Sequence, residues 1–163
     1  MRDLTALYKL LDSVVSLFDK LLAVETEKLD AIAVNDVEKL DEYMLSEQAL
    51  TMELRSLDAK REKEQSVLGF ENFTLNSIIQ AVDGDSPDDA AKLKDLMETL
   101  EQKTDELTVA VACTRKFIEL HLQSIDFVLA KMGEQREKEG SYQSSGEKSE
   151  QDSRPTQFTP RKV

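Results

Sequence analysis

The sequence predicts an all-α protein: an elongated antiparallel bundle of three long, coiled-coil-like helices, with a short extra helix and a disordered C-terminal tail. Three observations favour this fold. Of 163 residues, 33% are charged and 40% hydrophobic, with only five Gly and three Pro, which leaves few turns. Apolar residues recur at steps of three and four over long stretches, as on one face of a helix. After Gly140, Ser, Gln, Glu and Gly predominate.

The first helix is predicted over residues 3–33, where a single apolar face recurs with helical spacing. Glu25 interrupts that face once. We interpret it as a residue at a thin, hydrated part of the bundle, with a buried acid as the alternative. In the segment AVND that follows, Asn35 or Asp36 can cap a second helix. The apolar face consists of Leu4, Leu7, Leu11, Val14, Phe18, Leu21, Leu29 and Ile32.

The second helix is predicted from about residue 36 to 68, and Gly69 suits the left-handed residue that closes a helix. FENFTLNSIIQAV, residues 70–82, then predicts a short helix or ordered link that packs on the long helices. Ser86 as a cap, Pro87 at the first helical position and two aspartates after it predict a strong helix start. The predicted seam of the second helix is Val37, Leu40, Met44, Leu50, Leu54, Leu57 and Leu68.

The last helix is predicted to be the longest, because steps of four and three alternate from Leu93 to Met132 without a slip, as in a coiled-coil heptad. Gly133 can end it, although the sequence EQREKE can prolong it. We expect residues 1–139 to form the helical domain and residues 140–163 to be disordered in isolation.

The net charge of −12 argues against nucleic acid and against anionic membrane surfaces as partners. No window approaches the roughly 18 apolar residues that span a bilayer, and acids interrupt the N-terminal apolar run. We therefore expect a soluble, cytoplasmic protein without membrane insertion.

The chain offers few residues for catalysis or metal binding, since it contains a single His and a single Cys. Cys113 has apolar neighbours and is interpreted as a buried thiol that forms no disulfide. His121 falls on the heptad seam, where a structural role is favoured over metal ligation. We expect no enzyme activity, no cofactor and no metal, with a helical-bundle enzyme or metal protein as the remote alternative.

Between residues 117 and 129 the last helix is apolar over most of its circumference. A solvated coiled coil does not expose that much apolar surface. Either the other helices surround this stretch, or it is a surface for a partner helix or for self-association. The candidate partner-binding residues are Phe117, Ile118, Leu120, Leu122, Ile125, Phe127 and Leu129.

An ordered series of spacings in the first two helices resembles the FlgN-type flagellar export chaperones. The series comprises Leu21, Leu22, Glu25, Leu29, Asp36, Leu40, Leu50, Leu54, Arg61, Leu68 and Gly69. The family also tends to have a Tyr and, four residues later, a Gly after its last long helix, which correspond to Tyr142 and Gly146 in GSYQSSG. Glu47 stands where the family usually has a lysine, and the Asn-rich stretch common in its last helix is absent.

The resemblance implies a protein that binds hook–filament junction (hook-associated) proteins in the cytoplasm, keeps their terminal helices from assembling early and delivers them to the export apparatus. In such proteins the last helix and tail contact the cargo, and the tail Tyr docks on the export gate. This role would fall to Tyr142, with Gly146 beside it.

The alternative function is a structural coiled-coil scaffold that self-associates as a homo-oligomer and has no cargo. The exposed or buried state of residues 117–129 and the oligomeric state would separate the two.

Overall fold

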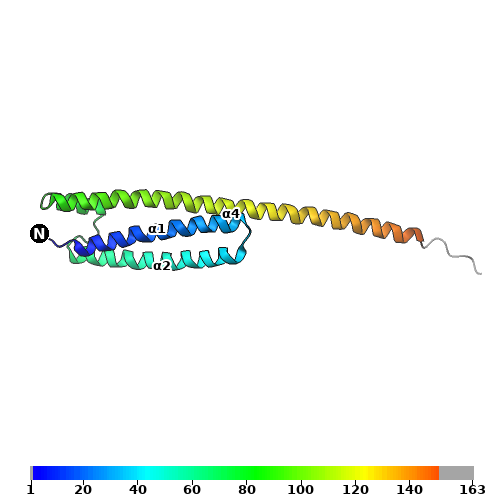
Figure 1. Ribbon diagram of the computed structural model, residues 1–163, viewed down its shortest axis with the longest axis horizontal. Coiled ribbons are helices and arrows are strands. Elements are labelled where there is room, and N and C mark those ends of the chain that lie inside the picture. Colours follow the sequence, from blue (N-terminus) through cyan, green and yellow to red (C-terminus); the bar gives the residue numbers. More distant parts are fainter. Residues whose placement is uncertain (1, 151–163) are drawn as a thin grey trace, which may run out of the picture. The chain divides into compact units, whose positions relative to one another are not determined.

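The computed structural model describes the backbone of residues 2–150 and the side chains of residues 2–141. Over this range the chain forms helices α1 (Thr5–Ala33), α2 (Val37–Val67), α3 (Leu75–Asp83) and α4 (Pro87–Glu150), and it contains no strand (Figure 1). The predicted all-α fold is therefore confirmed, and the three long helices and the short one lie where the sequence places them.

The chain divides after Glu119 into two compact units, which are described separately. The first unit contains α1, α2, α3 and the beginning of α4. Within it, α1 and α4 run in the same direction, because Tyr8 contacts Asp89 and, about three to four turns further on, Asp19 contacts Lys103. α2 runs antiparallel to both (Figure 1). The second unit contains the remainder of α4, from Leu120 onward.

Two left-handed residues end the first two helices and reverse the chain. Asn35 has φ of 55°, and the amides of Asn35 and Asp36 donate to the carbonyls of Ile32 and Ala31. Gly69, with φ of 78°, closes α2 in the same way, as the sequence predicts. This is the six-to-one, five-to-two pattern of a Schellman motif, which satisfies carbonyls that a helix end leaves free.

The starts of α2 and α3 are capped by the expected residue types. The carboxylate of Asp36 accepts from the amide of Lys39, and the hydroxyl of Thr74 accepts from the amide of Ser77. At the start of α4, Ser86 donates its hydroxyl to Asp89 at 2.8 Å. Asp89 also accepts from the hydroxyl of Tyr8 on α1, and these two hydrogen bonds lower the pKa of its carboxyl.

One buried core cluster lies at the end of the first unit where α1, α3 and α4 meet. Leu7, Ile78 and Leu93 are completely buried there, and Phe70, from the link after α2, is buried among them. Further along α1, Leu17, Leu21 and Ile32 are also buried, whereas the apolar residues of α2 are less deeply buried. On α2 the seam residues Leu40, Leu50, Leu54 and Leu57 are half-buried, whereas Val37 and Met44, predicted for the same seam, are exposed.

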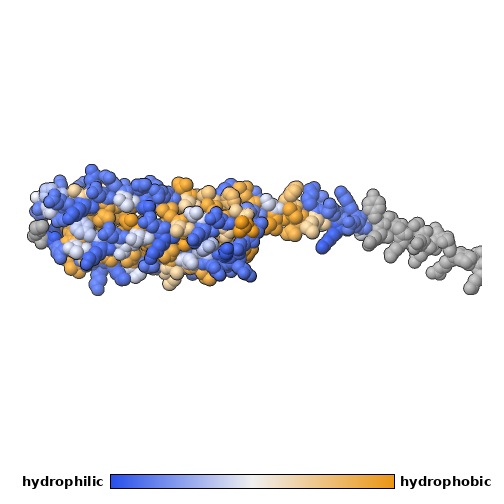
Figure 2. Space-filling model, viewed as in Figure 1, coloured by the Kyte–Doolittle hydropathy of each residue, from blue (hydrophilic) through white to orange (hydrophobic). Residues whose placement is uncertain are grey.

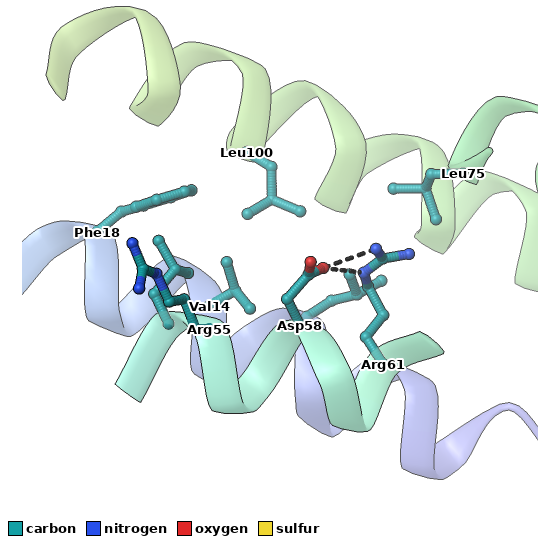
Figure 3. A pocket seen from close by; sticks show the side chains of 9 residues that line it. Val14, Phe18, Arg55, Asp58, Arg61, Leu75 and Leu100 are labelled. Carbon is teal, nitrogen blue, oxygen red and sulfur yellow. Dashed lines mark hydrogen bonds and ion pairs between the residues drawn. The ribbon is translucent and has the colours of Figure 1, made fainter. Parts of the chain in front are cut away.

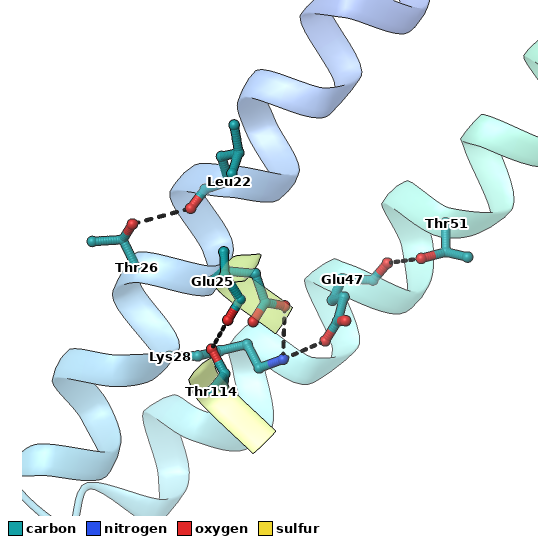
Figure 4. Close-up of polar contacts among 8 residues, drawn as sticks. Leu22, Glu25, Thr26, Lys28, Glu47, Thr51 and Thr114 are labelled. Atoms are coloured by element: carbon teal, nitrogen blue, oxygen red, sulfur yellow. Dashed lines mark hydrogen bonds and ion pairs between the residues drawn. The ribbon is translucent and has the colours of Figure 1, made fainter. Parts of the chain in front are cut away.

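A buried ion-pair network lies between α1 and α2. Glu25 and Lys28, on α1, are joined at 2.9 Å, and Lys28 reaches Glu47 of α2 at 2.6 Å (Figure 4). Thr114 of α4 lies close to this network, with its hydroxyl donated to the carbonyl of Ala110. Burial disfavours the Lys28 ammonium, but hydrogen bonds to Glu47 and Glu25 outweigh that effect and raise its pKa.

The interpretation of Glu25 as a hydrated residue was therefore wrong, and the buried acid is what the structure contains. Its side chain is 1% exposed because Lys28, one turn further along α1, supplies a cation inside the bundle. Glu47 of α2 accepts the other hydrogen bond of that cation. One buried lysine thus joins two acids from two helices.

The last helix continues through Gly133 and Gly140 to Glu150, ten residues past the expected start of the tail. A glycine in a helix costs only about 1 kcal/mol relative to Ala, and the Glu, Lys and Gln residues around these two are good helix formers. The prediction of disorder for residues 151–163 falls outside the described residues.

Replacing Lys28 with Met should destabilise the first unit by about 3–5 kcal/mol, because it leaves the Glu25 carboxylate buried without a cation. The double variant Glu25→Leu/Lys28→Met should recover most or all of that loss. Urea unfolding followed by circular dichroism measures both. A double variant as unstable as Lys28→Met alone would contradict this account of the network.

Candidate partner-binding surface on the last helix

The second half of α4 contains an almost uncharged stretch in a highly charged chain. From Phe117 to Ala130 the only charged side chains are Glu119 and Asp126. Ion pairs flank the stretch on both sides, Lys116 with Glu119 and Lys131 with Glu134, each at 3.4 Å. A helix that is apolar around most of its circumference is normally buried.

The candidate residues of this stretch are nevertheless exposed. Their exposed fractions run from 40% for Phe117 to 64% for Phe127, and Ile118 is half-buried. This is the exposure of surface residues and not that of a bundle core. Val128 and Met132, which the heptad pattern assigned to packing, are equally exposed and extend the surface. Phe117 and Ile118 belong to the first unit, and we call the seven exposed apolar residues of the second unit the α4 surface: Leu120, Leu122, Ile125, Phe127, Val128, Leu129 and Met132.

The α4 surface has two faces, because successive residues of a helix turn by about 100°. Leu122, Ile125 and Leu129 share one face, which continues the heptad seam. Leu120 and Phe127 lie on the opposite face, seven residues apart. Lys131 contributes to this second face, where its ammonium lies 5.8 Å from the centre of the Phe127 ring. A partner can therefore contact this helix from either side.

The tail residues predicted to dock on the export gate, Tyr142 and Gly146, belong to α4 by their backbone. The side chain of Tyr142 lies outside the described residues, so its role stays a prediction.

The single cysteine is exposed, contrary to the prediction of a buried thiol. Thr114, the next residue, is the one that faces inward and is buried, so Cys113 points away from the seam. His121 is half-buried, as its seam position suggests. Among the residues whose side chains are described, no group of three or more His, Cys, Asp or Glu is arranged to hold a metal ion.

A helical fold that exposes an uncharged apolar surface of this kind is typical of proteins that bind other polypeptides. The chain belongs to the FlgN family: the family model, described as FlgN protein, matches residues 1–150. The match covers all four helices, including the α4 surface and the position of Tyr142.

The family gives the general function. FlgN proteins are flagellar export chaperones, not enzymes, so the chain is a chaperone of flagellum assembly. Searches of curated proteins and of solved structures found no match to the chain. Within the part of the chain that the structure describes, no helix is long and apolar enough to cross a membrane.

Charging the α4 surface should leave the fold intact. In the variant Ile125→Glu/Phe127→Glu both replaced side chains are at least half exposed in the wild type, so the midpoint of thermal unfolding should stay within about 2 °C. The fluorescence of a dye that binds exposed apolar surface should fall. A large drop in the midpoint would show instead that these side chains stabilise the bundle.

Proposed function

We propose that this chain is a cytoplasmic export chaperone that binds hook-associated junction proteins, blocks their premature assembly and delivers them to the flagellar export apparatus. Membership of the FlgN family supports the proposal in general. The observation that carries it further is the exposed α4 surface, since the terminal helices of such cargo are amphipathic and need an apolar helical partner.

The α4 surface suits a chaperone that must release what it binds. Its side chains are aromatic and aliphatic, and the stretch from Phe117 to Ala130 carries charge only at Glu119 and Asp126, so an apolar contact there excludes water without burying ion pairs. Its two opposite faces let a cargo helix pack on one side while a second cargo segment packs on the other. When a cargo helix unfolds again for export, it loses all its contacts with the α4 surface together, and the cargo is released.

The competing function, a self-associating scaffold, uses the same surface. Exposed Phe127 and Leu129 favour a homo-oligomer as much as they favour cargo. Sedimentation velocity separates the two functions. A monomer at micromolar concentration that forms a defined complex with a purified junction protein supports the chaperone. A stable multimer that ignores junction proteins supports the scaffold.

The variant Ile125→Glu/Phe127→Glu should weaken binding of a purified junction protein by at least about tenfold, because two carboxylates would be buried in an apolar contact. The matched control is Leu45→Glu/Met52→Glu, which adds the same charge at two exposed apolar residues of α2. Calorimetric titration measures both. Equal losses in the two variants would refute the assignment of cargo to the α4 surface.

Export-gate docking is proposed for Tyr142 on the family resemblance. Tyr142→Ala should keep junction-protein binding within about twofold but weaken binding to the purified cytoplasmic domain of the export gate about tenfold or more, because an aromatic anchor is lost. Tyr142→Phe tests the hydroxyl alone, and Tyr43→Ala on α2 is the control for loss of a tyrosine elsewhere. If Tyr142→Ala binds the export gate as tightly as the wild type does, the assignment of Tyr142 to gate docking is wrong.

A further inference from the structure

An apolar depression lies in the first unit, and no residue of the α4 surface lines it. A hollow of about 450 Å³ opens between α4 and the pair α1–α2, roughly the size of a small-ligand pocket. Leu11, Val14 and Phe18 of α1 form one wall, Leu54 of α2 the second and Leu100 of α4 the third (Figure 3). We call this hollow the interhelical groove.

The short helix α3 already occupies one end of this groove. Its Ile78 and Val82 are buried against Leu4, Leu7 and Leu11 of α1 and Leu93 of α4. Its first residue, Leu75, forms the end wall of the hollow. The groove begins on the next turns of the same two helices, at Val14 and Phe18 of α1 and at Leu100 of α4. α3 therefore shows what packs here: a short amphipathic helix.

Beyond α3 the groove has no occupant from the described chain, so apolar walls are left open to solvent. Figure 2 shows hydrophobic residues gathered on the surface of the helical bundle. The residues from Leu11 to Phe18 span about two helical turns at 1.5 Å per residue. That length accommodates two or three apolar side chains of one helix face, at positions i, i+4 and i+7.

The charged residues that line the groove are Arg55, Arg61 and Asp58, so its lining has a net positive charge in a strongly acidic protein. Arg61 is already bound to Asp58, through two hydrogen bonds of 2.9 and 2.6 Å, and to Gln65 at 2.7 Å. Arg55 lines the same hollow without a hydrogen-bond or ion-pair partner among the described side chains (Figure 3). An unpaired guanidinium beside apolar walls favours a carboxylate, which it can bind through two parallel hydrogen bonds.

We propose that the interhelical groove is a second protein-binding site, which takes an amphipathic helix of a partner protein with a Glu or Asp beside its apolar face. The partner helix lies end to end with α3 and completes a four-helix arrangement in this part of the bundle. Its apolar side chains fill the hollow between Phe18, Leu54 and Leu100, and its carboxylate pairs with Arg55. This site is separate from the α4 surface and does not depend on the cargo proposed for it.

The probe is a pair of dye-labelled synthetic helical peptides of about 20 residues, long enough for helicity in water. Both have Leu at every third or fourth position. One has Glu on the positions that flank the Leu stripe and the other has Lys. Fluorescence anisotropy with the full chain should show binding of the Glu peptide and binding at least about tenfold weaker for the Lys peptide. This order is opposite to what the net charge of −12 alone would give.

Matched charge reversals then locate the peptide. Arg55→Glu should weaken the Glu peptide about tenfold or more, because an ion pair becomes a repulsion. Lys60→Glu makes the same change of charge at an exposed cation of α2 outside the groove, and it should change affinity less than about twofold. Phe127→Glu, on the α4 surface, should leave the affinity unchanged.

A groove-filling variant tests the apolar half of the site without touching charge. Val14→Phe adds a ring to the wall of the hollow, so the peptide should bind about tenfold more weakly while the thermal midpoint stays equal or rises. Equal effects of Arg55→Glu and Lys60→Glu, tighter binding of the Lys peptide, or loss of binding in Phe127→Glu alone would overturn the proposal. The anisotropy of the peptide could also fall again at high concentrations of the chain. That result would overturn the proposal too, because a second copy of the chain would then occupy the groove.

Discussion

The contact among Leu7, Ile78 and Leu93 determines the arrangement of the first unit, because it is where α1, α3 and α4 are held together by complete burial. α3 acts there as a wedge between α1 and α4. Next to Leu75, the first residue of α3, the side chains of α1, α2 and α4 leave a hollow, and beyond it α1 and α4 are joined by the ion pair of Asp19 with Lys103. The interhelical groove beside Leu54 and Leu100 is thus a consequence of how short α3 is.

Further along the bundle, an ion pair is buried among apolar residues of α1. Glu25 and Lys28 lie between Leu21 and Ile32, and their pairing with Glu47 ties α1 to α2 at one register. Buried ion pairs add little net stability compared with apolar residues of the same volume, but a shift of register would leave each charge unpaired. The thin core therefore gains specificity from a polar layer and stability from the apolar end.

The helices could be predicted from the sequence because caps and heptads are local signals. The helix boundaries predicted at Asp36, Gly69 and Pro87 are those of the structure. The sequence was insufficient where a residue's environment depends on another helix. Lys28 was missed because a lysine on a helix usually faces solvent, although its spacing of three from Glu25 was a usable signal. Cys113 was placed inside because its neighbours are apolar, whereas the seam passes through Thr114. The apolar stretch from 117 to 129 was recognised, but periodicity alone does not distinguish core from surface.

The absence of Lys and Arg between Phe117 and Ala130 has a thermodynamic consequence. A partner that covers this stretch releases few counterions and removes mainly apolar area from water, so its affinity should depend little on salt and its binding should carry a negative heat-capacity change. Apolar burial of this kind strengthens on warming from low temperature. The second unit is therefore suited to hold a partner across changes in ionic strength. The affinity of a partner for the charged faces of the first unit should depend more on salt.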